Sequence, residues 1–305
     1  MSYLHENEEL FGDTVVRTAN ALGLTTSVVV KDYFIFEMLR SIVGINPSVV
    51  FKGGTSLSKC HHVIDRFSED IDLGREVEHA TEGQRRKMKA MVVGSARRLG
   101  LEVSNLYETR SRREFNRYVL PLPTVGDPSM ASDTLVVETA VMTPASPAVR
   151  REIDSLVGEY LRANGFGDFA VKHRLLPFEL SVNSIERTYV DKVYALCDYY
   201  LDGAIPARQS RHVYDLYRLQ GSIVFDETLA ELFAKVGGQR NGLPRCHSAE
   251  DGILLSSTLA AIDSSDAYRG DYESVTSRLL YEDVPYDVAR EAFPTVIDFL
   301  HANGF

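Results

Sequence analysis

The residues with the most evident chemistry are the two carboxylates of Asp70-Ile71-Asp72. The surrounding pattern predicts a short strand over residues 70–74. Because residues i and i+2 of a strand project to the same face, the carboxylates are expected roughly 6 to 7 Å apart. Oxygen ligands so arranged suit Mg²⁺ or Mn²⁺, and such ions can stabilise both oxygens of an in-line phosphoryl displacement. An acidic strand edge is the alternative interpretation, so the neighbouring motifs matter.

A glycine-rich segment lies upstream of the carboxylates, where Gly53 and Gly54 are followed by Thr55, Ser56 and Lys59. It follows a β-prone run at residues 49–51 and precedes a helical pattern, which predicts a strand, a turn and a helix. Glycines let the backbone approach an anion, a new helix offers free N–H groups, and a serine can donate a hydrogen bond. The order of residues differs from a Walker A loop, and an ordinary turn is the alternative.

A third carboxylate is expected on a neighbouring strand. Glu138 is the only charged residue within positions 135–142, which are predicted to form a strand. Its carboxylate could help to hold a metal ion or accept the proton of an attacking hydroxyl. The alternative is an outward-facing residue on an edge strand.

The elements that must position these groups follow from periodicity and from turn residues. Helices are expected at residues 30–43 and 82–99, and further strands at 101–107, 115–120 and 134–142. A helix is expected from Ser146, as its N-cap, to a stop at Gly165, and helices dominate beyond it. The predicted fold class is therefore α/β (α+β), with a small mixed sheet in residues 1–144 and a mainly helical domain in residues 145–305.

Composition and charge exclude several classes of protein. The chain has 305 residues, 44% of them hydrophobic and 25% charged, which is typical of a folded domain. No stretch approaches the roughly 18 to 20 apolar residues of a membrane span and no signal peptide is evident, so we expect a cytoplasmic protein without membrane contact. Cys60, Cys197 and Cys246 are scattered, which indicates neither a disulfide framework nor a zinc site.

The net charge of −10 argues against a nucleic-acid-binding surface that covers the whole protein. Residues 84–117 nevertheless contain ten basic residues against three acidic ones. Such a basic segment could bind an RNA backbone, whereas a solvated helix face is the alternative. The candidate RNA-binding residues are Arg85, Arg86, Lys89, Arg112 and Arg113.

Four segments, in order, resemble the motifs of the AbiEii/AbiGii family of nucleotidyltransferase toxins: GGTSLSK (53–59), RFSEDIDL (66–73), ERTYVDKVYAL (186–196) and RHVYDLYRL (211–219). Residues 28–42 also resemble the N-terminal helix of that family. The resemblance implies a DNA-polymerase-β-like nucleotidyltransferase domain followed by a helical domain. Members are toxins of toxin–antitoxin or phage-defence systems, and some add nucleotides to the 3′ end of tRNA.

The resemblance also implies roles for individual residues. Asp70 and Asp72 would be the metal ligands, Lys192 would bind the triphosphate or the leaving pyrophosphate, and Asp215 matches the family aspartate. Either Asp215 or Glu138, which the strand pattern and not the resemblance indicates, would assist the acceptor hydroxyl. The residues expected at the nucleotide are Gly53, Gly54, Thr55, Ser56, Lys59, Arg66 and Ser68. This chain departs from the family in having Arg211-His212 where an Arg-Asp pair is frequent.

The sequence therefore predicts an Mg²⁺-dependent nucleotidyltransferase toxin that moves NMP from an NTP to a hydroxyl. The expected acceptor is the 3′ end of tRNA, whose modification would block translation, and the expected partners are NTP, tRNA and a cognate antitoxin. Two alternatives remain open. The acceptor could be a protein or a small molecule, or the chain could be a nucleotide-binding regulator without catalysis.

Overall fold

The computed structural model describes residues 2–77, 80–126 and 133–305, which form two compact units. The first unit comprises Met1–Cys60 and Glu69–Asn183, and the second comprises His61–Ser68 and Ser184–Phe305. This division lies later in the chain than the boundary expected near Pro144. The reason is that two strands beyond Pro144 pair with the sheet of the first unit.

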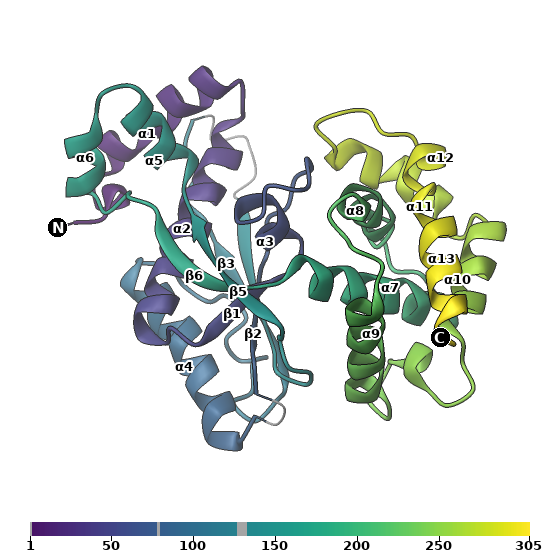
Figure 1. Ribbon diagram of the computed structural model, residues 1–305. Coiled ribbons are helices and arrows are strands. Elements are labelled where there is room, and N and C mark those ends of the chain that lie inside the picture. The colour runs from purple at the N-terminus through teal and green to yellow at the C-terminus, as the bar shows by residue number, and fades with distance from the viewer. Residues whose placement is uncertain (1, 78–79, 127–132) are drawn as a thin grey trace. The chain divides into compact units, whose positions relative to one another are not determined.

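The first unit is built on a six-stranded sheet, and the strands follow the order β3-β4-β2-β1-β6-β5 (Figure 1). The strands are β1 (Val49–Lys52), β2 (Ile71–Arg75), β3 (Phe115–Pro121), β4 (Thr134–Ala140), β5 (Ala148–Ile153) and β6 (Phe178–Asn183). β1 is antiparallel to β2 and parallel to β6, while β2 is parallel to β4. The sheet is therefore mixed, which confirms the fold class expected from the sequence.

Helix α2 (Thr26–Ile45) is the central helix of the first unit, because most of its side chains are buried. Thr25 caps its N-terminus by accepting a hydrogen bond from the backbone N–H of Val28. It packs against α4 and against strand β4, as well as against α1 and α5. The helices of this unit are α1 (Glu8–Leu22), α2, α3 (Gly53–Lys59), α4 (Glu82–Arg98), α5 (Leu156–Ala163) and α6 (Gly167–Lys172).

Two predicted elements differ from the structure. The helix expected from Ser146 begins only at Leu156, because Ala148–Ile153 pairs along its whole length with β6 and Ser155 supplies the N-cap. The strand expected at residues 101–107 is a loop with turns. There the side chain of Asn105 accepts a hydrogen bond from the N–H of Val119 and donates one to the carbonyl of Arg117. These bonds occupy backbone groups of β3 with which a further strand would otherwise pair.

The second unit is mainly helical, as expected for the C-terminal part of the chain. Its α-helices are α7 (Ile185–Leu201), α8 (Arg211–Gln220), α9 (Glu227–Arg240), α10 (Leu255–Ser264), α11 (Arg269–Ser274), α12 (Tyr286–Ala289) and α13 (Ala292–Ala302). α7 packs on α8, α9 and α10, and α10 packs on α13. Among the described residues, no helix has both the length and the apolar character that crossing a membrane requires.

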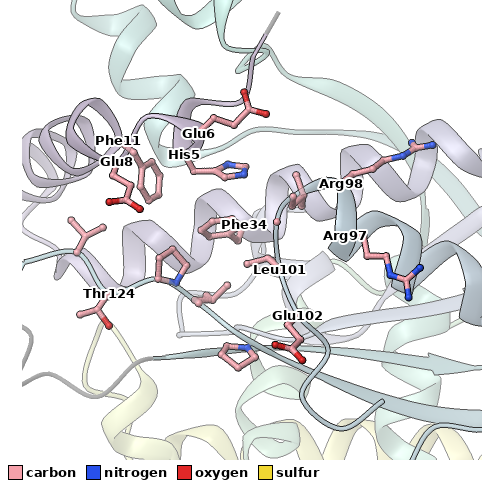
Figure 2. A pocket seen from close by; sticks show the side chains of 16 residues that line it. His5, Glu6, Glu8, Phe11, Phe34, Arg97, Arg98, Leu101, Glu102 and Thr124 are labelled. Carbon is pink, nitrogen blue, oxygen red and sulfur yellow. The ribbon is translucent and has the colours of Figure 1, made fainter. Parts of the chain in front are cut away.

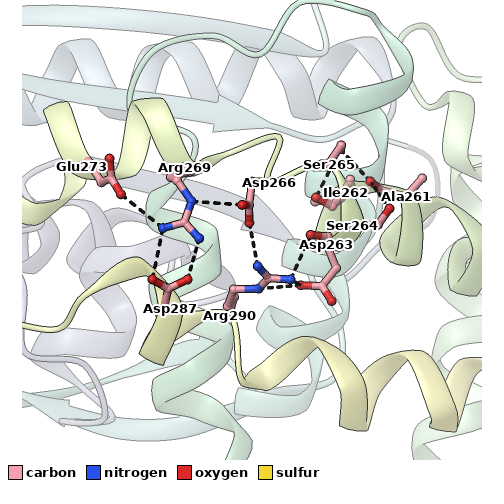
Figure 3. Close-up of polar contacts among 10 residues, drawn as sticks. All are labelled: Ala261, Ile262, Asp263, Ser264, Ser265, Asp266, Arg269, Glu273, Asp287 and Arg290. Atoms are coloured by element: carbon pink, nitrogen blue, oxygen red, sulfur yellow. Dashed lines mark hydrogen bonds and ion pairs between the residues drawn. The ribbon is translucent and has the colours of Figure 1, made fainter.

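Two arginines link the short helices of the second unit (Figure 3). Arg290 binds Asp263 and Asp266 at the end of α10, each with a shortest separation of 2.7 Å. Arg269 binds Asp266 and, across to α12, Asp287. Single exposed ion pairs contribute little, but here Asp266 is shared by both arginines, so the pairs form a network. The network therefore connects three helices that are too short to be stable alone.

The buried carboxyl of Glu37 on α2 gives a prediction about stability and pH. Burial raises the pKa of Glu37 to about 7 from its ordinary value of 4.5, although Arg40 and Arg174 oppose the shift. In the described structure neither carboxyl oxygen has a hydrogen-bond partner. The folded protein therefore holds a proton that the unfolded chain releases between pH 4.5 and 7, and stability is lost as pH rises through this range.

Glu37→Gln should remove this dependence. We expect the variant to be more stable than the wild type at pH 8, by up to about 3 kcal/mol, and nearly equal to it at pH 4.5. Urea unfolding at the two pH values measures the difference. An equal difference at both values would contradict the assignment.

Candidate active site

The first glycine of the turn after β1 is in direct contact with the second carboxylate. Gly53 has φ of +77°, a conformation that residues with a side chain rarely adopt. A Cβ added to Gly53 would lie 2.0 Å from Oδ2 of Asp72, so the carboxylate occupies the space of the missing side chain. The GGTSLSK and DID segments therefore meet within the first unit, and glycine is required for their approach.

The strand register extends this site across the sheet. Asp72 pairs with Lys52 of β1 on one side and with Glu138 of β4 on the other, and Glu138 pairs with Arg117 of β3. Residues directly opposite one another share a face of the sheet, so two adjacent carboxylates lie between two basic residues. Nε of Arg117 lies 3.4 Å from Oε1 of Glu138. Adjacent carboxylates repel each other, which favours the binding of a cation between them.

The donor set at this edge of the sheet fits Mg²⁺ that arrives with a nucleotide. Asp70 immediately precedes β2, which begins at Ile71, and it lies two residues before Asp72 in the chain. Within the residues that the structure describes, no three or more His, Cys, Asp or Glu side chains cluster tightly enough to enclose a metal ion. Mg²⁺ commonly uses only one or two carboxylates, with water and substrate phosphates completing its shell. The geometry therefore fits a metal–nucleotide complex better than a closed protein site.

Other residues of the first motif maintain the turn itself. The buried hydroxyl of Ser56 donates to the carbonyl of Gly53 at 2.8 Å, and Thr55 is buried beside it. The ammonium of Lys59 binds the carboxylate of Asp32 on α2. Gly54 follows Gly53 in the first turn of α3. Ser56 and Lys59 thus have partners within the protein, and their expected contact with phosphate stays a prediction.

In the second unit, three predicted residues form one buried ion-pair cluster. Arg66 donates from Nε and from a terminal nitrogen to the two oxygens of Asp215, each at 2.7 Å. Nζ of Lys192 lies 2.5 Å from Oδ2 of the same carboxylate. All three side chains are almost completely buried. The cluster therefore joins α7 and α8 to residues 61–68, the segment that ends at Ser68.

The charges of this cluster limit what Asp215 can do. Burial by itself raises the pKa of Asp215, but Arg66 and Lys192 outweigh burial and hold that pKa well below its ordinary range. Burial lowers the pKa of Lys192, with Asp215 opposing the shift. A carboxylate stabilised in this way accepts a proton poorly. The expectation that Asp215 assists the acceptor hydroxyl is therefore disfavoured, and the residue is better described as the counterion of Arg66 and Lys192.

The departure from the family pattern at position 212 lies at the same cluster. Nδ1 of His212 is 3.4 Å from Nζ of Lys192. Burial and the charge of Lys192 hold the pKa of His212 well below its ordinary value, so the imidazole is neutral. An aspartate at this position would bring a second negative charge to a cluster in which Asp215 is paired with both Arg66 and Lys192.

The basic residues of α4 and the following loop lie on the surface, partly paired. Arg85 binds Glu114, and both Arg86 and Arg112 bind Glu82. Lys89 donates to the carbonyl of Thr109, and Arg113 is exposed. Two aromatic side chains are also exposed here, Tyr107 of the loop (74% exposed) and Phe115, the first residue of β3 (45%). Exposed aromatic rings beside arginines are suited to nucleic acid, because bases stack on the rings. We call this set of residues the basic surface.

A cavity of about 880 Å³ lies elsewhere in the first unit (Figure 2). Its side chains include Phe11 and Phe34, with Arg97 and Arg98 also lining it. None of the residues predicted for the active site lines this cavity. The candidate site therefore stays where Gly53 contacts Asp72, between β1 and β2, and not at this cavity.

Sequence reasoning missed four residues that the structure connects with these motifs. Lys52 and Arg117 join the site through strand register, which a single sequence does not reveal. Lys31 and Asp32 bind residues of the motifs from α2. The available signal for the second pair was two adjacent charges inside a mainly apolar helix.

Gly53→Ala tests whether the glycine sets the position of Asp72. The added methyl must displace the carboxylate, and the left-handed backbone alone costs about 1–2 kcal/mol. We expect reduced stability in urea unfolding and about tenfold weaker Mn²⁺ binding. Gly44→Ala is the matched control, because a Cβ there meets open space within α2, and it should be neutral or stabilising. Unchanged Mn²⁺ binding by Gly53→Ala would contradict the assignment.

Comparisons with known proteins bear on the fold and the family of the chain. The structure is similar to that of the nucleotidyltransferase toxin MenT4 from Mycobacterium tuberculosis H37Rv, with a TM-score of 0.57 and 20% identity, covering 94% of this chain and 89% of that one. A weaker similarity, with a TM-score of 0.45 and 17% identity, links it to JHP933 from Helicobacter pylori, covering 87% and 90% of the two chains. A comparison with curated proteins finds no match.

The family comparison covers most of the chain. Residues 37–298 match the model described as nucleotidyl transferase AbiEii toxin, type IV toxin–antitoxin system. The match includes the glycine turn, both carboxylates, Glu138 and the cluster around Asp215. The chain therefore has the DNA-polymerase-β-like nucleotidyltransferase fold, and it belongs to the AbiEii family of nucleotidyltransferase toxins of type IV toxin–antitoxin systems.

Proposed function

We propose that this nucleotidyltransferase transfers NMP from an NTP to the 3′ end of tRNA. The observation that carries the proposal is the contact of Asp72 with Gly53, with Glu138 next to Asp72 in strand register. It joins a turn suited to phosphate with carboxylates suited to a divalent cation. That combination supports phosphoryl chemistry on a nucleotide.

In the proposed reaction the acceptor hydroxyl oxygen attacks the α-phosphorus of the NTP. A new bond forms between them, the bond from the α-phosphorus to the bridging oxygen breaks, and pyrophosphate leaves with the electron pair. Glu138 accepts the proton of the hydroxyl. We favour Glu138 over Asp215 for this step, because the buried carboxylate of Asp215 is already ion-paired with both Arg66 and Lys192.

Asp70 and Asp72 would hold Mg²⁺, or Mn²⁺ in its place, which would neutralise negative charge on the triphosphate. Gly53 leaves room for the carboxylate of Asp72 beside the turn, so nucleotide and ligand can be close. Lys52 and Arg117 flank the carboxylates in the strand register. Their positive charges favour binding of the triphosphate and of the leaving pyrophosphate.

The basic surface supports RNA as the acceptor. It combines arginines with the exposed rings of Tyr107 and Phe115, on a chain whose net charge is otherwise negative. A protein or small-molecule acceptor would not require such a surface. Family membership further implies a cognate antitoxin, and modified tRNA 3′ ends would block translation.

Asp70→Asn and Asp72→Asn test the mechanism. Either substitution removes a charge needed for the metal and should reduce nucleotide transfer at least about 100-fold, with the fold intact. The assay incubates total tRNA, Mg²⁺ and each labelled NTP in turn with wild type or variant. Transfer retained by either folded variant would contradict the mechanism.

The same assay separates the alternatives. Label on tRNA from the wild type alone supports the proposal and identifies the base. Label on a protein or small molecule instead would change the acceptor class. Binding of NTP without any transfer would favour a regulator that lacks catalysis.

The basic surface has its own test. The double variant Arg112→Glu, Arg113→Glu should bind tRNA more weakly, and the slope of log affinity against log salt should fall by about 1 to 2. Arg150→Glu, Arg151→Glu is the matched control, since it makes the same charge change at two exposed arginines of β5, outside the basic surface. Equal losses in both double variants would indicate a general effect of charge and not a specific surface.

A further inference from the structure

Helix α2 buries two adjacent and opposite charges. Only 3% of Lys31 and 9% of Asp32 is exposed, within a helix that is otherwise mainly apolar. A charge buried without a partner costs several kcal/mol, so such residues persist where ion pairs and hydrogen bonds compensate them. The partners of these two charges therefore indicate what the helix holds.

Lys31 holds the segment that leads into the metal-binding carboxylates. Its ammonium binds the carboxylate of Glu69, and it lies 2.9 Å from Oδ1 of Asp133. Glu69 is the residue directly before Asp70. The ion pair of Lys31 therefore involves the residue bonded directly to Asp70, the first carboxylate.

Asp32 holds the other signature segment. One carboxylate oxygen binds the ammonium of Lys59, the last residue of α3, and the other accepts the backbone N–H of Leu156 at 2.7 Å. α3 begins at Gly53, which touches Asp72. Asp32 therefore fixes the far end of the helix that starts at the glycine turn.

We propose that Lys31 and Asp32 are positioning residues, which together set the place of the Asp70 and Asp72 carboxylates relative to the glycine turn. The inference rests on the proposed function of that turn and those carboxylates. Adjacent residues of a helix point about 100° apart, so one rigid turn of α2 can reach both segments. Supporting partners of this kind typically change metal affinity or activity by about 10- to 100-fold.

The first arm of the test uses the sign of the charge. Lys31→Met removes a positive charge near the carboxylates, so electrostatics alone predicts tighter binding of a cation. Positioning predicts the opposite, about tenfold weaker binding of the Mn²⁺ complex of an α,β-methylene NTP, measured by calorimetry without turnover. Glu69→Gln should weaken binding to a similar extent. This variant keeps Lys31 paired with Asp133, so it replaces Lys31→Met if that protein is too unstable to study. Lys31→Arg should restore most of the affinity.

Two variants serve as matched controls for this arm. Asp133→Asn removes the other partner of the same ammonium but leaves Glu69 in place, so its affinity should stay within about twofold of wild type. Glu37→Gln changes a buried acid on the same helix and should behave likewise. The unfolding temperature of each variant separates loss of position from loss of fold.

The second arm concerns the nucleotide. Asp32→Asn should release Lys59 and raise the KM for NTP about tenfold, with a smaller change in kcat, because the turn and not the reacting centre is disturbed.

Folded Lys31→Met and Glu69→Gln proteins that bind the complex as tightly as wild type would overturn the proposal. Absence of transfer by the wild type would instead refute the proposed function, and the binding experiment would still test the positioning.

Discussion

The pairing of buried charges on helix α2 is the constraint on which the candidate site depends. Lys31 and Asp32 lie inside the core of the first unit, where charges persist because each has a partner. Their partners are Glu69, which precedes the candidate metal ligand Asp70, and Lys59, at the end of the glycine-turn helix. These ion pairs compensate the buried charges of α2. They therefore also hold the segment before Asp70 and the end of α3, which are separate in the sequence.

Strand register brings the other residues of the candidate site together. β2 lies between β1 and β4, so Asp72 has Lys52 on one side and Glu138 on the other. Since glycine at position 53 leaves space for the carboxylate, the turn and the acidic row are in contact. A turn suited to phosphate, a pair of acids and two flanking cations come together in this way from four neighbouring strands.

In the second unit, the buried charges form a cluster around Asp215. Asp215 is surrounded by Arg66 and Lys192, which neutralise it and lower its pKa, so the cluster acts as a structural connection between α7, α8 and residues 61–68. From the sequence, Glu138 on a predicted strand and Asp215 in a family motif were both candidates to assist the acceptor hydroxyl. Burial and ion pairing distinguish Asp215 from Glu138. A proton acceptor must be basic, and the lowered pKa of Asp215 makes its carboxylate a weak base.

The sequence by itself determined the features that depend on nearby residues. Alternating patterns and turn residues identified β1, β2, β3 and β4, the basic helix α4 and the glycine turn, and the order of four motifs indicated the family. Only the tertiary structure decided that Ala148–Ile153 is a strand, because its pairing partner β6 lies 25 or more residues further along the chain. It alone revealed Lys52, Arg117, Lys31 and Asp32, since register and buried ion pairs join residues far apart in sequence, and a local pattern carries no record of such partners.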